Sequence, residues 1–341
     1  MKMIFQVSLC LGLLLACTVV TVHANNVPVS QKEHSVNEQG VLALYETVPD
    51  ALGDIELVVS DETLIIAERL AAALQQRQPG LIVNLRTFSQ TVSEQWWRIA
   101  PASKMALFFM PMPRQEIDTF VQARGYDPIE LRVAADAIAV VVNQNNPVAN
   151  RGMERVEIDG LFSETGRRGH LPLRSWGQLG VKNDWQERPI EPVAQMSTTS
   201  VSRHFRRLAL KGGDYRRDIP RLKSSAQVIR RVSDDASAIG YIARSQLDAR
   251  VKAVTVSGWD EENNANSVAA DDPAVLQNPL AFWLYLYVDQ KPGSPLAATT
   301  RAFLRFFYSQ EGQQLMSDAG YMSVNPEIAA DDFNKHGLVW P

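Results

Sequence analysis

The hydrophobic pattern of the chain centres on residues 137–142 (AIAVVV), a run that is continuously apolar and rich in β-branched side chains. Asp136 precedes it, and Asn145, Asn146 and Pro147 close it. The run is far shorter than the ~20 apolar residues that cross a bilayer. It is typical of a strand buried on both faces, as in parallel sheets with helices on each side. We therefore predict that the chain leaves one α/β lobe and starts a second at this strand.

The segment before this strand has the pattern of a βαβ unit. Residues 55–59 (IELVV) predict a strand, and residues 64–74 predict a helix because their apolar positions recur at helical spacing. Pro79 and Gly80 end that helix, and residues 81–85 (LIVNL) predict the next strand. This order favours an α/β fold in which each lobe is a mainly parallel sheet with helices on both faces.

The rest of the chain alternates between helical and strand patterns. Residues 25–50 are polar and weakly patterned, and we expect a flexible N-terminal arm there. Further helices are predicted at residues 89–99, 115–124 (capped by Gly125), 202–210, 226–232, 299–310 and 313–319. Further strands are predicted at residues 105–110, 129–133, 190–193, 238–242, 251–256 and 279–288.

Length and charge narrow the class of protein. At 341 residues the chain is too long for one typical core, so two lobes or domains are expected. The hydrophobic fraction of 45% and the charged fraction of 21% fit an ordinary globular protein. The net charge is −4 and the chain has no basic run, which argues against nucleic acid as the main partner.

The first 24 residues have the pattern of a signal peptide. Lys2 forms a short positive region, residues 4–16 are largely apolar, and Val22, His23 and Ala24 offer a cleavage site. A second interpretation is a lipoprotein signal, because residues 14–17 (LLAC) resemble a bacterial lipobox that ends at Cys17. We rank cleavage after Ala24 first, since the segment that follows Cys17 is too apolar for a typical lipoprotein tether.

Both cysteines, Cys10 and Cys17, lie inside this leader. Cleavage after Ala24 leaves a mature chain without cysteine, which excludes thiol catalysis, disulfides and cysteine metal sites. An exported protein without disulfides fits a bacterial periplasm, and we predict that location.

No sequence motif indicates an enzyme. The chain lacks GxSxG, HExxH and the phosphate-binding GxxxxGK[ST] pattern. The histidines of the mature chain are scattered without metal-ligand spacing: His34, His170, His204 and His336. We therefore predict a protein without catalytic residues, metal site or cofactor.

The candidate chemistry lies in polar turns before helices, where unpaired backbone N–H groups can bind an anion. The candidate ligand-binding residues are Thr63 and Asp61 in one turn, Ser89 in a second, and Ser197, Thr198, Thr199 and Ser200 in a third. The third turn precedes Arg203, Arg206 and Arg207. For the third turn, a hydroxyl-rich helix cap explains the residues equally well. For residues 60–63, capping is the stronger explanation, because Asp61 and Glu62 would repel an anion. Three such turns that face one cleft at the strand ends would form a ligand site.

The closing part of the chain resembles a known family. The quoted pieces are residues 284–288 (LYLYV), 309–313 (SQEGQ) and 319–321 (AGY), together with Asp136 and its strand, Trp176, and residues 238–241 (AIGY). They are similar to the periplasmic phosphate-binding proteins of ABC importers, over roughly residues 55–326. The resemblance implies a two-lobed fold that closes on its ligand. It also implies that residues 51–135 with 254–341 form one lobe and residues 136–253 the other.

The resemblance implies a small oxyanion such as phosphate as the ligand and an ABC importer permease in the inner membrane as a partner. The ligand turns depart from the family pattern. Asp61 stands where the family has serine, residues 105–113 (MALFFMPMP) lack polar ligands, and no arginine precedes Ser197. An arginine there would supply paired, charge-assisted hydrogen bonds. Two hypotheses follow: a solute-binding receptor, or a sensor or interaction protein that kept the fold and lost phosphate binding.

Overall fold

The computed structural model describes residues 42–88, 95–258 and 278–338. Its strands are β1 (Gly53–Ser60), β2 (Leu81–Phe88), β3 (Met105–Phe108), β4 (Ile129–Asn143), β5 (Met153–Glu154), β6 (Glu191–Pro192), β7 (Ala194–Gln195), β8 (Arg221–Leu222), β9 (Ala238–Ala243), β10 (Val251–Val254), β11 (Val256–Ser257), β12 (Ala281–Val288) and β13 (Met322–Ser323). Its α-helices are α1 (Leu64–Arg77), α3 (Trp96–Ile99), α4 (Arg114–Arg124), α5 (Val148–Arg151), α6 (Arg155–Phe162), α7 (Ser200–Leu208), α8 (Ser225–Asp234), α10 (Ala298–Phe307), α11 (Gln310–Asp318) and α12 (Pro326–Lys335). Short 3₁₀ helices are η1 (Trp176–Leu179), η2 (Asn183–Trp185) and η3 (Arg244–Gln246).

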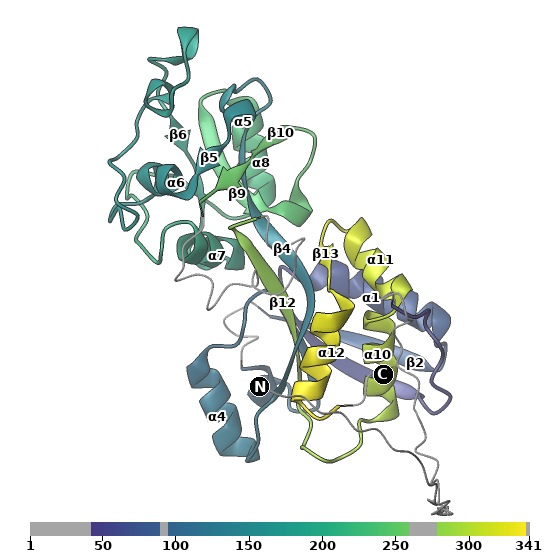
Figure 1. Ribbon diagram of the computed structural model, residues 1–341. Coiled ribbons are helices and arrows are strands. Elements are labelled where there is room, and N and C mark those ends of the chain that lie inside the picture. The colour runs from purple at the N-terminus through teal and green to yellow at the C-terminus, as the bar shows by residue number, and fades with distance from the viewer. Residues whose placement is uncertain (1–41, 89–94, 259–277, 339–341) are drawn as a thin grey trace, which may run out of the picture. The chain divides into compact units, whose positions relative to one another are not determined.

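The predicted α/β class is confirmed, and the long strand β4 holds the fold together. Nine strands are hydrogen-bonded in the order β2-β1-β3-β12-β4-β9-β6, with β10 and β13 also on β4. The predicted strands at 129–133 and 137–142 are one strand of 15 residues, and every residue from Val133 onward is buried. Figure 1 shows β4 running beside β12 and continuing to β9.

Pairing differs along the sheet. As predicted, β1 pairs in parallel with β2 and β3, which gives a βαβ unit through α1. The strand at β4 was expected to be parallel as well, and that expectation is wrong. It pairs antiparallel with β12 over its first part and with β9 and β10 over its last part. A strand buried on both faces has the same apolar sequence in either direction, so burial alone does not determine the partner's direction.

The change of partner along β4 falls at Asp136 and Ala137. Phe282 and Ala281 of β12 lie opposite these two residues, and from Ile138 onward the partner is β9. The chain returns after β11 to place β12 between β3 and β4. The lobe boundaries, 51–135 with 254–341 and 136–253, stay a prediction that this pairing pattern supports.

Several local predictions are confirmed. The helix α1 ends just before Pro79 and Gly80, and α4 ends at Gly125, whose φ of 77° is a conformation that suits glycine. On α1 the buried face includes Ile66 and leaves Ile65 exposed. The helix predicted at 89–99 is described only as α3, since residues 89–94 lie outside the described ranges.

The described part of the N-terminal segment is packed, in contrast to the loose arm expected for residues 25–50. The Tyr45 hydroxyl donates to the Gln78 side chain at 3.0 Å, and the Tyr45 backbone N–H donates to Glu311 at 2.9 Å. The Val48 N–H donates to the same Gln78 oxygen at 3.1 Å. Residues 25–41 lie outside the described ranges. The arm begins to pack at Leu42 because apolar Leu42, Tyr45 and Val48 are each buried.

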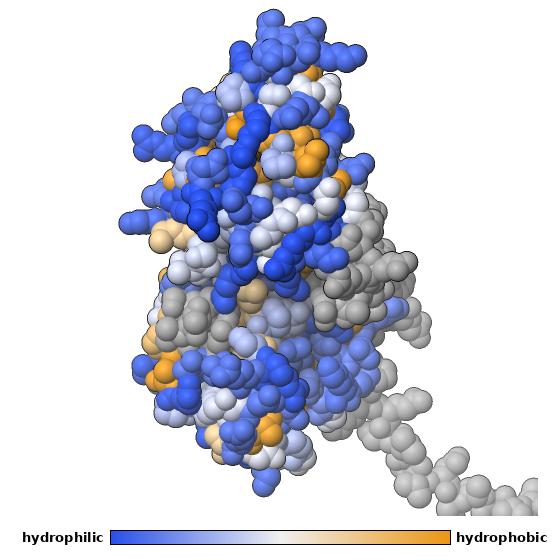
Figure 2. Space-filling view, turned by 90° about the vertical axis from the view of Figure 1, so that its left-hand side faces the viewer, coloured by the Kyte–Doolittle hydropathy of each residue, from blue (hydrophilic) through white to orange (hydrophobic). Residues whose placement is uncertain are grey.

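Three apolar clusters form the core. The largest lies on both sides of β4 and includes α1, α6, α7 and α10 residues. A second gathers Trp96, Trp97, Phe108, Phe120 and Tyr287. The third packs α8 against β9. The face shown in Figure 2 is mostly hydrophilic, with hydrophobic residues scattered between the polar ones.

Candidate functional site

The start of α7 is the best-defined of the predicted ligand turns. Thr199 is its N-cap residue, and the Thr199 hydroxyl accepts a hydrogen bond of 3.1 Å from the Ser202 N–H. The same hydroxyl donates to the Met196 carbonyl at 3.1 Å. Ser197 and Thr198 precede it on the exposed part of the turn. The Thr199 side chain is therefore engaged in capping the helix.

Ser200, the first residue of α7, is fully buried. Its backbone N–H donates a 2.8 Å hydrogen bond to Oε1 of Glu62, which lies in the turn before α1. Within the described ranges, the Ser200 hydroxyl and Oε2 of Glu62 are both buried and have no hydrogen-bond partner. A carboxylate thus lies on the N-terminus of α7, the place where the positive end of a helix favours an anion.

The polar side chains in the turn before α1 make contacts that differ from the predicted ligand contacts. The buried Thr63 hydroxyl lies 3.1 Å from the carbonyl oxygens of Ser60 and Leu107 and accepts a 3.0 Å bond from the Ser60 N–H. It therefore ties the turn to β3. Asp61 is exposed, and its neighbour Glu62 contacts α7 instead. Two adjacent carboxylates have the same sequence signature, and only the local turn decides which one faces the helix.

Of the seven predicted site residues, the structure brings Ser200 to the turn that holds Thr63 and Asp61. Ser197, Thr198 and Thr199 stand on the approach to α7. Ser89 lies outside the described residues. Residues 105–113 were noted for their lack of polar side chains, and their polar contact with α7 is made by the backbone, through the Phe109 carbonyl oxygen.

The contact to Phe109 is made by His204. Its Nε2 lies 2.7 Å from the Phe109 carbonyl oxygen, and its ring stacks on Phe282 with centroids 3.7 Å apart. Nη2 of Arg207 lies 3.3 Å from the other ring nitrogen, Nδ1. Complete burial, together with the positive charge of Arg207, holds the pKa of His204 well below its usual range. The ring is therefore neutral, and the geometry fits Nε2–H donating to Phe109 while Nδ1 accepts from Arg207.

The three arginines of α7 divide between two faces. Arg206 turns outward and pairs with Asp214 at 2.8 Å. Arg207 lies on the inner face, where burial lowers its pKa. Arg203 shares that face, since its charge adds to the lowering of the pKa of His204. Positions 200, 203, 204 and 207 follow the i, i+3, i+4, i+7 spacing of one helix face. This spacing is the sequence signal that could have singled out His204.

A tyrosine network holds the start of α7 against β9. The Tyr241 hydroxyl accepts a 3.1 Å bond from the Gln195 N–H and lies 2.8 Å from the Tyr215 hydroxyl. It also lies 3.1 Å from the Ser202 hydroxyl, and the Tyr241 ring stacks on Phe205 at 3.8 Å. Burial raises the pKa of Tyr241, so the hydroxyl stays protonated. The strand of Tyr241 resembles the family in sequence, but no sequence pattern predicted this tyrosine network.

Asp136 marks the point where β4 changes partner. The carboxylate is fully buried and accepts bonds from the Ala137 N–H at 2.7 Å, the Ser245 N–H at 3.2 Å and the Ser245 hydroxyl at 2.6 Å. Burial raises the pKa of Asp136 to about 6, although these hydrogen bonds oppose the rise. Asp136 thus joins β4 to Ser245 in the segment that directly follows β9.

Two other kinds of feature are absent from the described ranges. In these ranges no three histidine, cysteine, aspartate or glutamate side chains are grouped so that they could hold a metal ion. None of the helices in the same ranges combines the length and apolar character needed to cross a membrane.

The chain is similar in sequence to known binding proteins. The family model described as a PBP superfamily domain matches residues 102–311. The phosphate-binding protein PstS of Pseudomonas aeruginosa is 27% identical over 305 residues, which covers 86% of this chain and 90% of PstS.

Solved structures with the same fold include two receptors. An ABC-type phosphate transport receptor from Vibrio cholerae has a TM-score of 0.57 and 18% identity, with 80% of this chain and all of that chain covered. A putative phosphate ABC transporter substrate-binding protein from Clostridium perfringens, solved with bound phosphate, has a TM-score of 0.58 and 20% identity over the same shares. At these identities the likeness concerns the fold, and it confirms the two-lobed binding-protein architecture.

Proposed function

The chain belongs to the PBP superfamily, and on that premise we propose that it is a periplasmic solute-binding receptor for a small oxyanion, phosphate in the first place. It binds the anion between its two lobes and delivers it to an ABC importer permease in the inner membrane. It acts without catalysis, cofactor or metal. Its relatives named above are described as phosphate-binding or substrate-binding proteins, which supports this class.

The observation that carries the proposal is the carboxylate of Glu62 on the first N–H of α7, at 2.8 Å. A negatively charged group already accepts from the backbone N–H at this helix terminus, and the hydroxyl of the same residue, Ser200, is buried without a hydrogen-bond partner in the described ranges. An incoming oxyanion takes the place of the Glu62 oxygen and accepts from the Ser200 N–H and hydroxyl. Hydroxyls of Ser197, Thr198 and Ser89 complete the proposed set, whereas the hydroxyl of Thr63 is engaged with the carbonyl oxygens of Ser60 and Leu107.

Positive charge on the inner face of α7 supports the same ligand. Arg203 and Arg207 lie on the face that begins with Ser200, while His204 between them stays neutral. A charge-assisted hydrogen bond from such an arginine contributes about 1.5–3 kcal/mol. The family arginine that is absent before Ser197 thus has a candidate replacement from within the helix itself.

The nearby carboxylates set the protonation state of the ligand. Asp61 and Glu62 repel a fully ionised anion, but a monobasic phosphate can donate a hydrogen bond from its own hydroxyl to the carboxylate of Asp61. A favourable hydrogen bond then replaces the repulsion between the two negative charges. We therefore expect phosphate affinity to fall as the pH rises past the second ionisation of phosphate.

A second candidate is favoured by one observation. Glu62 already fills the anion position, and the ring of His204 packs on Phe282 beside the Phe109 carbonyl. A chain whose own Glu62 carboxylate occupies the anion position fits a sensor or interaction protein that kept the fold and lost phosphate binding. The two candidates make opposite predictions for ligand binding.

A thermal-unfolding screen with phosphate, sulfate and other small anions separates them. A receptor with free ligand at about 100 times Kd gains about 2.7 kcal/mol of stability. The receptor proposal expects phosphate to raise the melting temperature more than sulfate does at equal ionic strength. A melting temperature that no anion raises at millimolar concentration rejects the receptor and leaves the sensor.

A further inference from the structure

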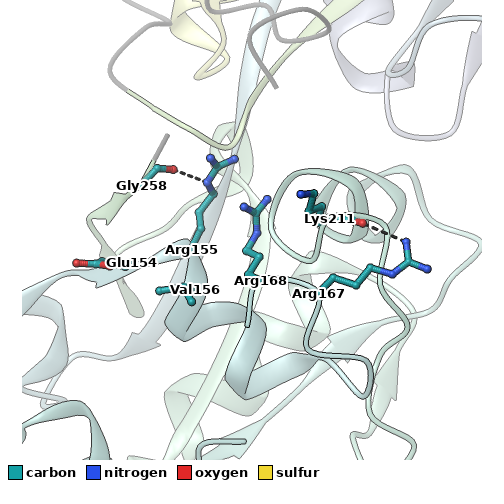
Figure 3. A pocket seen from close by; sticks show the side chains of 7 residues that line it. All are labelled: Glu154, Arg155, Val156, Arg167, Arg168, Lys211 and Gly258. Atoms are coloured by element: carbon teal, nitrogen blue, oxygen red, sulfur yellow. Dashed lines mark hydrogen bonds between the residues drawn. The ribbon is translucent and has the colours of Figure 1, made fainter. Parts of the chain in front are cut away.

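The two ends of α7 differ in how their polar groups are paired. At the C-terminal end, Nη1 of Arg155 and Nη2 of Arg168 donate to the Leu208 carbonyl oxygen at 3.3 Å and 2.8 Å. Figure 3 shows both arginines at this end, where their hydrogen bonds cap the helix. At the N-terminal end, Oε2 of Glu62 and the Ser200 hydroxyl are buried and have no hydrogen-bond partner within the described ranges. A buried acceptor without a donor costs free energy, so we searched the neighbourhood of Glu62 for a donor.

Tyr321 is a donor that the fold brings to this region. The strand β13 begins directly after Tyr321 and pairs antiparallel with residues 134–135 of β4, next to Asp136. Gly320 has a φ of 88°, and a Cβ at this position would lie 2.9 Å from Cα of Ser245. The backbone before Tyr321 therefore lies directly against Ser245. Three segments thus meet at the Ser245 side chain: β4, η3 and the turn before β13.

The Ser245 hydroxyl links Asp136 to Tyr321 in one hydrogen-bonded chain. Oγ of Ser245 lies 2.6 Å from Oδ2 of Asp136, and the Ser245 side chain also bonds to Tyr321. A hydroxyl has one proton, so Ser245 donates to ionised Asp136 and accepts from Tyr321. Burial, with the negative charges of Asp136 and Glu62, raises the pKa of Tyr321, so the phenol keeps the proton that it donates. Glu62 is therefore near enough for its charge to act on the Tyr321 hydroxyl.

We propose that Tyr321 is a positioning residue of the anion site, and that the protonation state of Asp136 sets the direction in which the Tyr321 hydroxyl donates. With Asp136 ionised, the chain runs from Tyr321 through Ser245 to Asp136. With Asp136 protonated, the carboxyl donates to Ser245, Ser245 donates to Tyr321, and the Tyr321 proton is released to Oε2 of Glu62 as a hydrogen bond. One proton is taken up at Asp136 and each hydroxyl keeps its own, so the chain reverses by rotation of the two hydroxyls.

The consequence for ligand binding rests on the proposed receptor function. A hydrogen bond from Tyr321 reduces the negative charge that Glu62 presents to the anion, so protonation of Asp136 favours binding. Burial raises the pKa of Asp136 to about 6, which places the reversal in weakly acidic solution. Arg244 of η3 opposes the rise in the pKa of Asp136, and Arg69 of α1 opposes the rise in the pKa of Tyr321. Both arginines stay charged throughout this range.

The first test follows the side-chain carboxyl of Asp136 by NMR titration of the ligand-free mature chain. In Tyr321→Phe the ring has no oxygen to accept from Ser245, so the protonated state of Asp136 loses a hydrogen bond. Asp136 should then need a proton concentration about tenfold higher to become protonated. In a Ser245→Ala background the chain is already broken, and Tyr321→Phe should not change the titration further. Tyr126→Phe is the matched control, because the Tyr126 hydroxyl bonds to another buried carboxylate, Asp289, at 2.8 Å, and it should leave the titration of Asp136 unchanged.

The second test is a calorimetric titration with inorganic phosphate at about pH 5.5 and about pH 7.5. The ratio of the dissociation constants of Tyr321→Phe and the wild type cancels the ionisation of phosphate itself. Tyr321→Phe should weaken binding about threefold or more at the lower pH and less at the higher pH. The same ratio at both pH values would show that Tyr321 does not position Glu62, and would overturn the inference.

The two tests separate the inference from the proposed function. If the wild type binds no phosphate at millimolar concentration, the receptor function fails, and the NMR titration still decides whether the chain exists. If Asp136 titrates identically in the wild type and in Tyr321→Phe, the inference is wrong while the receptor function stands.

Discussion

Oε1 of Glu62 accepts a 2.8 Å hydrogen bond from the backbone N–H of Ser200, 138 residues further along the chain. The bond joins the turn before α1 to the first residue of α7. It places a negative charge at a helix N-terminus, which the helix dipole favours. We propose the same position for the ligand, and on that proposal the Glu62 carboxylate competes with the anion.

Replacement of Glu62 by glutamine should raise anion affinity about tenfold, which corresponds to about 1.4 kcal/mol. The glutamine oxygen can still accept from the Ser200 N–H, but the negative charge that repels the ligand is gone. Calorimetric titration with phosphate measures the change. Asp61→Asn is the matched control, because Asp61 is exposed and its change should be smaller. A larger gain from Asp61→Asn than from Glu62→Gln would assign the role to Asp61 instead.

Replacement of Thr199 by alanine should lower the free energy of unfolding by about 1 kcal/mol, because α7 loses its N-cap hydrogen bond to Ser202. Chemical denaturation measures this loss. Ser197→Ala removes a hydroxyl from the exposed part of the same turn and should stay within about 0.5 kcal/mol of the wild type. Equal stability of the two variants would show that the cap contributes nothing.

Asp136 should make the protein less stable as the pH rises from about 4 to about 6. Its pKa is raised to about 6 in the folded protein from 3.8, so in this range the folded state holds a proton that the unfolded state has lost. The stability contribution is complete below the unfolded pKa and is lost as the pH passes the folded pKa. This rise in the pKa of Asp136 corresponds to about 3 kcal/mol in the free energy of unfolding.

Asp136→Asn isolates this effect, since asparagine keeps an oxygen that can accept from the Ala137 or Ser245 N–H. The difference in unfolding free energy between variant and wild type should grow in favour of the variant from pH 4 to pH 6. A difference that does not change with pH would contradict the assignment.

Individual helices and strands could be predicted from the sequence because the spacing of apolar residues and the residues that end each element lie within the element itself. The helix α4 shows both its apolar spacing and its closing Gly125, and β12 is a long apolar run. Two helices with local signals were nevertheless missed. The helix α6 carries Ile158, Leu161 and Phe162 at helical spacing, and α12 starts with Asn325 as N-cap and Pro326 at its first position.

The site could be predicted only in part, because its decisive contact is not local. Ser200 was identified from its place before a helix, whereas the partner that meets it depends on how β1, β3 and β12 assemble. Glu62 and Asp61 are equivalent in sequence until the turn directs one of them to α7. The stacking of His204 on Phe282 likewise joins α7 to β12, which no pattern within either segment reveals.

The predicted signal peptide leads to a separate test on the mature protein. Mass spectrometry of protein from the periplasmic fraction should find a chain that starts near Asn25 and contains no thiol. A lipid-modified Cys17 at the N-terminus would establish the lipoprotein alternative. Recovery of the intact chain from the cytoplasm alone would reject export.

The most direct test of the central claim is phosphate titration of the wild type and of Ser200→Ala by calorimetry, with melting temperatures measured in parallel. The Ser200 hydroxyl is buried and has no partner in the described ranges, so its removal should leave the free protein equally stable or more stable. Ser202→Ala is the structural control and should destabilise the protein, because that hydroxyl bonds within the tyrosine network. Our account predicts that Ser200→Ala weakens phosphate binding at least about fivefold without loss of stability. Unchanged phosphate affinity in Ser200→Ala, or a wild type that binds no phosphate at millimolar concentration, would contradict it.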